Sequence, residues 1–542
     1  MLLISLVPVW AFTYFPSQDG PAHLGTAATL LDLRTSKDLL AQVYRADWDF
    51  STNEVYPALL RGLGSFAPLL LVEKLLLSLY VVGLPLASLY ACRLSGGAAW
   101  AAYLAFPLIY TLPLYMGFYN LCFGLPLFVL TLGYYAAYAK APSLRRGAVL
   151  SGTLLALYFV HLLPALCAAA VIALAAVIRA SRRRAVGAEP FPVAYRLKQS
   201  GALLSLVPVT IVALSFLASF RQHTELPPRP APEVTGLKAS LPQPLRAIVS
   251  PVVNPLSPYR KAVYLLDGFS KTDRLYTLPY ALLLAALSVL ALSSVRRHRG
   301  LSEQAYLLVP VLAALGVLAV APERYGPIGW LPGRLWPLVA LLVTFWLSQT
   351  PLPVRVWRWT GVAALVITSF SAIYRLPVHA QLSAVTKEYV SAAAQLEPNT
   401  TVLPVHLGAR YQHEGLKPQL QRAKFDAINH AAGYLSLAKP LVNLRNYQPA
   451  RPYFPLQYRR GYDPRIYLSP DDETSRFESF PLHLDLNRFR ERTGAAVDYV
   501  LLWGDPERTA FSDVGDLYAQ LDEYTLKSVS SPRGLMRVYE RR

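Results

Sequence analysis

The segment "MLLISLVPVWAFTYFPSQDGPAHL", Met1 to Leu24, changes within a few residues from a wholly apolar run to a loop that carries Asp19 and His23. An acidic residue directly after a membrane-length apolar run is either a helix cap or a chemically active group. Asp19 followed by Gly-Pro and an apolar helical stretch is a good N-cap signal. A carboxylate at the end of a span, beside a helix N-terminus, also has an environment that can tune its chemistry. The segment by itself leaves both possibilities open.

The composition predicts a membrane protein. Of the 542 residues, 54% are hydrophobic and only 16% are charged, and the mean hydropathy is +0.32. An ordinary soluble protein carries about 25% charged residues. The sequence contains no P-loop, no GxGxxG after a strand, no CxxC pair and no HExxH, so ATP-driven and dinucleotide chemistry have no support. These observations exclude an ordinary soluble enzyme.

About eleven apolar runs are long enough to cross, or nearly cross, the ~30 Å hydrocarbon layer of a membrane. They lie near residues 1–15, 67–91, 98–113, 117–138, 147–162, 164–179, 202–219, 275–294, 304–321, 335–349 and 357–374. We therefore expect a polytopic α-helical membrane protein. The first run lacks a preceding basic region, which disfavours a signal peptide. A start codon misplaced within a longer helix would equally explain its length.

Basic residues collect in alternate loops, and this pattern predicts the orientation of the chain. The clusters are Arg93; Lys140, Arg145 and Arg146; Arg179, Arg182, Arg183, Arg184, Arg196 and Lys198; Arg296, Arg297 and Arg299; Arg355 and Arg358. Cytoplasmic loops of membrane proteins carry such an excess of Lys and Arg. The N-terminus is therefore expected inside and the C-terminus outside. The net charge of +19 follows from topology and gives no reason to expect a nucleic acid partner.

The composition changes near residue 374. Residues 1–374 are the expected transmembrane module, with outer loops at 16–66, 221–274 and 322–334. Residues 375–542 are polar and of mixed charge. In this tail, "TTVLPVHL", "DYVLLWG" and "GLMRVYE" are typical of strands, and "VTKEYVSAAAQL" and "DVGDLYAQLDE" of helices. We expect a small extracytoplasmic α/β domain.

The first outer loop is expected to contain two helices. "GPAHLGTAATLLDL", from Gly20, has apolar residues at helical spacing and suits an amphipathic helix lying on the membrane interface. "NEVYPALLRGL", Asn53 to Leu63, fits a second helix, with Pro57 in the first turn, where proline is tolerated.

Three residues could act with Asp19 in a site. His23 lies four residues later, on the same face of the expected helix; the two are candidate metal ligands, although a metal site usually has more. His161, in "YFVHLLPAL", lies at the outer end of a span, where it is either an interfacial residue or an acid–base group. Asp49 belongs to a loop that by default is solvated, and it could face Asp19 across a cleft.

The segment "PERYGPIGWLPGR" carries Glu323, Arg324 and Arg334 between two spans. All three should lie near the outer membrane surface, at the depth of Asp19. The planar guanidinium groups of the two arginines suit a lipid phosphate. Arginines at span ends also commonly extend along the apolar surface toward water, so either role fits.

The layout of the chain resembles the GT-C membrane glycosyltransferases, which include protein O-mannosyltransferases and aminoarabinose lipid A transferases. An aspartate follows the first span, a long outer loop with interfacial helices leads to the second, and a soluble outer domain follows many spans. "FPSQDGPAHL", "MGFYNLCFGLPL", "HLLPAL" and "GWLPGRLWPL" are also similar to stretches in bacterial membrane proteins of this kind. The resemblance implies a GT-C-like fold in the bacterial inner (plasma) membrane, among membrane lipids.

The resemblance also implies a reaction. Such enzymes move a sugar from a polyprenyl-phosphate carrier to a hydroxyl of a glycan, lipid or protein acceptor. An acid of the first outer loop is the catalytic base, a role that falls on Asp19. Mannosyltransferase-type members often have two adjacent acids there, whereas Gly20 follows Asp19, which puts the acceptor class in doubt.

On this hypothesis Arg334, Arg324 or a divalent metal ion stabilises the departing phosphate, and direct displacement inverts the anomeric carbon. His23, His161, Glu323 and Asp49 would complete substrate binding. The alternatives are a lipid-linked saccharide transporter or flippase, an oligosaccharide polymerase or ligase, and a non-catalytic member of the same fold.

Overall fold

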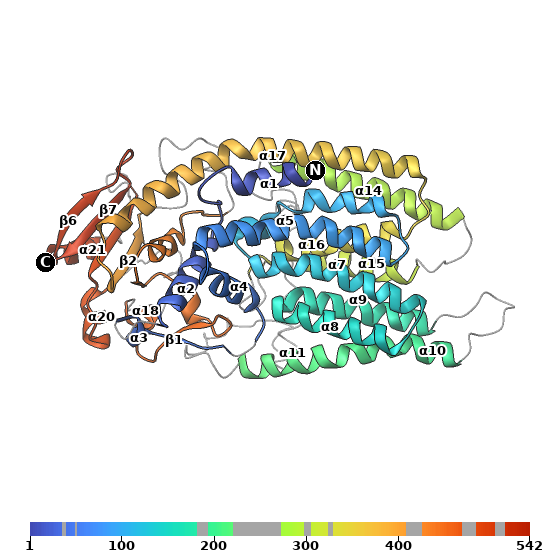
Figure 1. Cartoon of the computed structure of the whole chain (residues 1–542), viewed down its shortest axis with the longest axis horizontal. Coiled ribbons are helices and arrows are strands. Elements are labelled where there is room, and N and C mark those ends of the chain that lie inside the picture. The colour runs from blue at the N-terminus through green and yellow to red at the C-terminus, as the bar shows by residue number, and fades with distance from the viewer. Residues whose placement is uncertain are drawn as a thin grey trace, which may run out of the picture. The chain divides into compact units, whose positions relative to one another are not determined.

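The computed structural model describes residues 1–34, 39–48, 51–181, 193–220, 273–297, 305–323, 329–407, 425–468, 484–504 and 515–542 (Figure 1). The chain forms two compact units. We call Met1–Leu6, Leu79–Leu114 and Asn120–Ile373 the helical unit, and Val7–Ser78, Tyr115–Tyr119 and Tyr374–Arg542 the mixed unit. This division differs from the one expected at residue 374, because most of the first outer loop groups with the tail.

The helical unit is built from apolar helices. They are η1 (Ala99–Leu108), α7 (Tyr119–Lys140), α8 (Leu144–Val160), α9 (Leu162–Ser181), α10 (Val193–Ser200), η2 (Gly201–Leu206), α11 (Val207–Phe220), α14 (Arg274–Arg297), α15 (Ala305–Val320) and α16 (Leu331–Ser348). Helix α9 packs between α8 and α15, and α15 packs on α16 (Figure 1). Almost every residue of α16 is buried, so it lies at the centre of this unit. Large apolar side chains of α11 and α14, such as Leu214 and Val289, are exposed, as on a lipid-facing surface.

Four helices connect the two units: α1 (Leu2–Trp10), α5 (Leu69–Leu94), α6 (Leu112–Met116) and α17 (Val354–Val390). Helix α17 has 37 residues and is therefore about 55 Å long. The expected span 357–374 ends in the middle of this helix. The segment "VTKEYV", expected to start a separate helix of the tail, is its last part, because the helix continues through Pro377 without a break.

Seven helices among the described residues are long and apolar enough to cross a membrane. They are Leu69–Leu94, Tyr119–Lys140, Leu162–Ser181, Leu197–Ala218, Arg274–Arg296, Leu331–Ser348 and Val354–Gln395. Two apolar helices are shorter, Ala99–Leu108 and Tyr306–Val320. The first expected span forms only the nine-residue α1, about 14 Å long. The helices are thus compatible with an integral membrane protein, but their lengths alone do not reproduce the expected count of about eleven.

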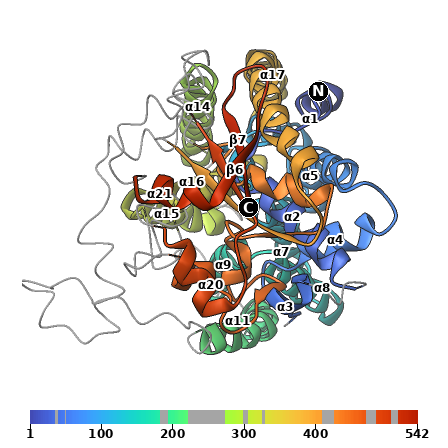
Figure 2. The same cartoon turned by 90° about the vertical axis from the view of Figure 1, so that its left-hand side faces the viewer.

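The mixed unit contains a five-stranded sheet in the order β3-β2-β5-β7-β6. The strands are β2 (Thr400–His406), β3 (Leu441–Asn443), β5 (Tyr499–Trp503), β6 (Tyr524–Val529) and β7 (Met536–Arg541). Strand β2 runs parallel to β3 and β5, and β7 runs antiparallel to β5 and β6. Figure 2 shows β6 and β7 side by side. The three strands expected from the sequence are therefore confirmed as β2, β5 and β7. The central strands are buried along most of their length, as in sheets covered on both faces.

The mixed unit also contains short helices. They are α3 (Leu39–Val43), α4 (Val55–Gly64), η5 (Ser391–Gln395), η7 (Ala431–Leu437), η8 (Gln448–Ala450), α18 (Pro464–Tyr467), α20 (Leu486–Thr493), α21 (Gly515–Gln520) and η11 (Leu521–Glu523). The expected helix at Asn53–Leu63 is confirmed as α4, and the expected helix "DVGDLYAQLDE" is confirmed as α21 and η11.

The first outer loop and the tail share one hydrophobic core. Leu30 and Leu40 of the loop pack in the same cluster as Leu403 and Val500 of the sheet. Strand β1 (Tyr44–Ala46) also pairs antiparallel with β4 (Leu456–Tyr458) of the tail. These segments are about 400 residues apart in the sequence, so the mixed unit forms only when both ends of the chain come together.

Helix α2 (Gly20–Asp32) does not lie on a surface. All its residues from Gly20 to Leu30 are buried, so the expectation of an amphipathic interfacial helix is wrong. The reason is its contact with η7: a Cβ atom on Gly25 would lie 2.8 Å from the Cα atom of Gly433, and one on Gly433 would overlap the Pro21 carbonyl. The tail thus covers the face of α2 that the sequence pattern assigns to water.

Candidate functional site

Asp19 stands at the N-cap position of α2, but its side chain makes no capping hydrogen bond. Its backbone is helical, with φ −94° and ψ −12°, whereas a capping residue usually adopts an extended conformation. The turn at residues 115–117 holds the loop instead. The Gln18 amide donates to the Tyr115 carbonyl over 2.9 Å, and the Asp19 amide donates to the Met116 carbonyl over 3.2 Å. The carboxylate therefore points to partners other than its own helix.

Those partners come from the tail. The Tyr447 hydroxyl donates to Asp19 Oδ2 over 3.2 Å, and His430 Nε2 lies 3.7 Å from Asp19 Oδ1. Gln18 Nε2 donates to Oδ1 over a longer distance of 3.4 Å. The Asp19 side chain is 12% exposed, so the carboxylate is enclosed but keeps some contact with the exterior.

Tyr447 is a fixed donor. Burial, and next the Asp19 carboxylate, raise the pKa of the Tyr447 hydroxyl well above its ordinary value. The hydroxyl therefore keeps its proton, and a hydrogen bond to a charged acceptor contributes about 1.5–3 kcal/mol. This bond orients the carboxylate.

His430 is neutral beside Asp19. Burial lowers its pKa from 6.5 to about 3, and the charge of Arg445 acts in the same direction. The 3.7 Å contact with Asp19 is therefore no ion pair at neutral pH. Nε2 is bonded to the Asn429 amide nitrogen over 3.0 Å, which assigns the ring proton to Nδ1. Among the described residues, Nδ1 finds no hydrogen-bond partner although it is buried.

His23 is held at both ring nitrogens. Nε2 donates to the Gly117 carbonyl over 3.1 Å, and Nδ1 accepts from Gln448 Nε2 over 3.0 Å. Burial lowers the pKa of His23 from 6.5 to about 4, so the ring is neutral. Metal ligation at His23 would have to break one of these bonds. The described residues contain no group of three His, Cys, Asp or Glu side chains able to hold a metal ion.

Further hydrogen bonds support the cluster. Asn446 Nδ2 donates to Thr26 Oγ1 of α2 over 3.1 Å, and its Oδ1 accepts from the Gln448 amide over 3.1 Å. Gly117 has φ +77°, and a Cβ atom there would lie 2.6 Å from the Gly20 nitrogen. The turn that anchors Asp19 therefore requires glycine.

The other sequence candidates do not join this cluster in the mixed unit. His161 and Arg334 both belong to the helical unit, where the charge of Arg334 acts on His161. Arg334 Nε donates to the Gly329 carbonyl over 2.9 Å, and the Glu323 carbonyl accepts from the Leu331 amide over 3.1 Å. Arg324 and Asp49 lie outside the described residues.

The residues that the tail contributes were not among the candidates expected from the sequence; they are His430, Arg445, Tyr447 and Gln448. They come from "INHAAGYL" and "NLRNYQP", which have neither helical nor strand periodicity. The sequence feature that could have pointed to these residues is the high content of histidine, arginine, asparagine and tyrosine in two short segments without periodicity. Nothing local connects them to Asp19, because the contact spans more than 400 residues.

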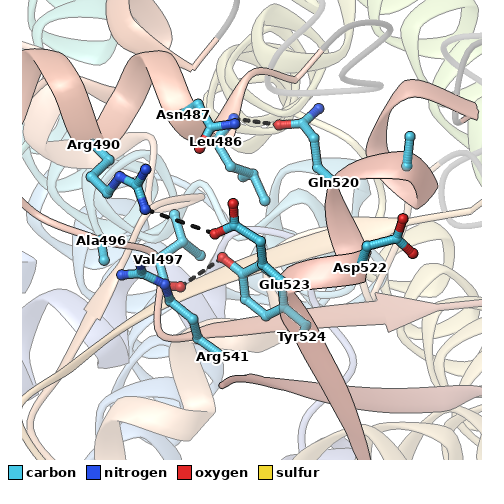
Figure 3. Close-up of a pocket in the computed structure, with 11 residues that line it drawn as sticks. Leu486, Asn487, Arg490, Ala496, Val497, Gln520, Asp522, Glu523, Tyr524 and Arg541 are labelled. Atoms are coloured by element: carbon cyan, nitrogen blue, oxygen red, sulfur yellow. Dashed lines mark hydrogen bonds and ion pairs between the residues drawn. The ribbon is translucent and has the colours of Figure 1, made fainter.

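Two cavities among the described residues lie apart from Asp19. One, of about 300 Å³, lies in the mixed unit between α20, η11 and the end of β7 (Figure 3). The other, of about 20 Å³, lies in the helical unit beside Tyr110, Tyr280 and Trp336, and has room for about one water molecule. Asp19 lines neither of them.

No protein-family model matches the sequence, and a search of curated proteins finds no match.

Proposed function

We propose that this protein is a membrane glycosyltransferase. It transfers a sugar from a polyprenyl-phosphate carrier to an acceptor hydroxyl at the outer face of the membrane, with Asp19 as general base. One observation carries the proposal: the Asp19 carboxylate does not cap its helix and is instead held by Tyr447 beside neutral His430. A carboxylate with only a structural role would be expected to accept the free amides of α2.

The proposed sugar transfer requires a base for the acceptor hydroxyl, here the Asp19 carboxylate, and a donor with a good leaving group. The acceptor oxygen attacks the anomeric carbon and forms the new glycosidic bond, while the bond from that carbon to the phosphate oxygen breaks. The phosphate leaves with the electron pair, and Asp19 takes the hydroxyl proton. Because a single base assists one direct displacement, the configuration at the anomeric carbon inverts. No ATP is required, since a sugar phosphate already has a good leaving group.

Arg445 is our candidate for stabilising the leaving phosphate, in addition to the Arg324 and Arg334 of the sequence hypothesis. Its side chain is buried, and its charge acts on His430, the neighbour of Asp19. A guanidinium fixed in a site of low dielectric stabilises developing negative charge strongly.

We place eleven crossings in the membrane: α1, α5, η1, α7, α8, α9, α11, α14, α15, α16 and α17. The division into units supports this count. The first loop, the turn at 115–119 and the tail belong to one compact unit, so they lie on one side. The chain must then cross twice between Ser78 and Tyr115, and only η1 is available as the partner of α5. The basic loops place the mixed unit outside and the N-terminus in the cytoplasm, in the inner membrane of a bacterium.

A non-catalytic role is the second candidate, and one observation favours it. His23, His430 and Gln448 beside Asp19 are buried, and the Asp19 side chain itself is only 12% exposed. The cluster would then only fasten the first loop to the tail, in a transporter or an assembly partner.

A transfer assay separates these roles. The purified chain, in lipid nanodiscs, is given a panel of polyprenyl-phosphate monosaccharides, and release of polyprenyl phosphate is measured. We expect release with at least one donor, and a loss of roughly 100- to 10,000-fold in Asp19→Asn. Asp47→Asn is the matched control, because Asp47 is a more exposed acid of the same loop, paired with Arg45, and should keep full activity. Equal rates in the two variants would exclude Asp19 as the base.

A further inference from the structure

The cavity of about 300 Å³ in the mixed unit has a rigid frame. Gln520 Oε1 accepts from the Leu486 amide, and its Nε2 donates to the Leu484 carbonyl, each over 2.7 Å. The Tyr524 hydroxyl donates to the Val497 carbonyl over 2.7 Å. These bonds fix α20, the end of α21 and the start of β6 around the opening (Figure 3).

Several polar groups that line the cavity form no hydrogen bond or ion pair in the part of the chain that the structure describes. They are the Arg541 guanidinium, the Asp522 carboxylate and the Asn487 amide; the Arg541 charge acts on Asp498 and Tyr524 only at longer range. Arg490 and Glu523 face each other over 3.7 Å, and both are about half exposed. An exposed pair of this kind contributes little to stability, so its atoms also remain available to a ligand.

The charges of the lining select the class of ligand. Two guanidinium groups and two carboxylates line the same cavity, so an anion would face Asp522 and Glu523, and a cation would face Arg490 and Arg541. A neutral molecule with several hydroxyl groups avoids both conflicts. Each of its hydroxyls donates to a carboxylate and accepts from a guanidinium or an amide.

We propose that this cavity is a carbohydrate-binding site that takes a neutral sugar. Its volume lies at the lower end of the range for small-molecule sites, which suits one small ligand. Leu486, Val497 and Ala519 supply an apolar floor for the carbon face of a sugar ring. The site does not depend on the proposed transfer reaction, since none of its residues contacts Asp19.

The test is a binding titration of the full chain in lipid nanodiscs, without sugar-based detergent. Glucose, mannose, galactose and N-acetylglucosamine are the probes, and glycine and inorganic phosphate are the charged comparisons. Saturation-transfer NMR follows the protons of the sugars and of glycine, and phosphate is tested by its ability to displace a bound sugar. We expect at least one sugar to bind at millimolar concentration, more tightly than glycine or phosphate. Asp522→Asn and Arg541→Gln should each weaken binding about tenfold or more. Both variants should fold, because neither side chain forms a hydrogen bond or ion pair with the residues that the structure describes.

Two matched controls each remove one charge, of the same sign as in the cavity variants, at a residue outside the cavity. Glu491→Gln and Arg542→Gln should bind the sugar as the unmodified chain does. Asp19→Asn should also bind it normally, so failure of the transfer proposal would leave this result intact. The carbohydrate site is refuted if no sugar binds, if glycine or phosphate binds more tightly, or if the two cavity variants retain full affinity.

Discussion

Asp19 occupies the position from which a carboxylate usually caps a helix, yet its partners lie in the tail. The sequence allowed both a cap and an active group, because the N-cap rule uses only local residues. The decisive contact, with Tyr447, comes from a segment more than 400 residues away. The helical backbone of Asp19 shows the physical outcome: the hydrogen bond to the tail takes the place of a local capping bond.

The buried histidines predict how stability depends on pH. In the folded chain, burial lowers the pKa of His23 to about 4 and that of His430 to about 3, whereas each has a value of 6.5 when solvated. Below pH 6.5 the unfolded chain therefore binds more protons than the folded one, and acid favours unfolding. We expect the unfolding temperature to fall as the pH is lowered from 7 to 5, because the free energy of unfolding decreases by up to roughly 1 kcal/mol per pH unit for each histidine.

Thermal unfolding of the full chain, followed by intrinsic fluorescence, checks this. His430→Gln should lower the unfolding temperature at pH 7 and reduce its further fall toward pH 5. An identical pH dependence in the variant would show that His430 is not held neutral by the fold.

At the scale of elements, α2 shows why a sequence pattern can predict a helix and still misplace it. The helix itself was expected from its apolar spacing, and it forms over Gly20–Asp32. Its small residues, including Gly25, read as a polar face toward water. In the structure they allow η7 to approach α2 closely at Gly433. An approach that depends on two glycines in distant segments leaves no periodic signal.

The close approach of α2 and η7 can be tested with one methyl group. Gly433→Ala places a Cβ atom against the carbonyl of Pro21, so the two elements must separate. We expect a loss of at least about 1–3 kcal/mol of stability, and loss of transfer activity because His430 precedes η7 directly. Gly62→Ala is the matched control: nothing lies within 4 Å of its added Cβ, and alanine in α4 should be neutral or slightly stabilising. Equal melting temperatures for the two variants would contradict the packing.

At the scale of the whole molecule, the sequence predicted the parts better than their grouping. Apolar runs and β-branched segments identified membrane-length helices and the strands β2, β5 and β7, because each depends on local composition. The mixed unit depends on pairs such as Tyr44 with Tyr458, which join segments that no local pattern relates. The tail residues of the candidate site were missed for the same reason.

The topology follows from that grouping and can be tested in intact cells. Cysteines are introduced at three exposed positions: Ser65 of the first loop, Arg533 of the tail, and Arg145 between α7 and α8. A membrane-impermeant maleimide should label Ser65→Cys and Arg533→Cys but not Arg145→Cys, which should react only after the membrane is opened. Labelling of only one of the first two would contradict a mixed unit built from both segments.

The most direct test of the central claim compares donor binding and turnover in Asp19→Asn. With a donor identified in the transfer assay, affinity and rate are measured on the same nanodisc preparation. If Asp19 is the base, the donor affinity should stay within about threefold of the unmodified chain while turnover falls by about 100-fold or more. If turnover stays unchanged, or if binding is lost together with turnover, Asp19 is not the group that accepts the proton.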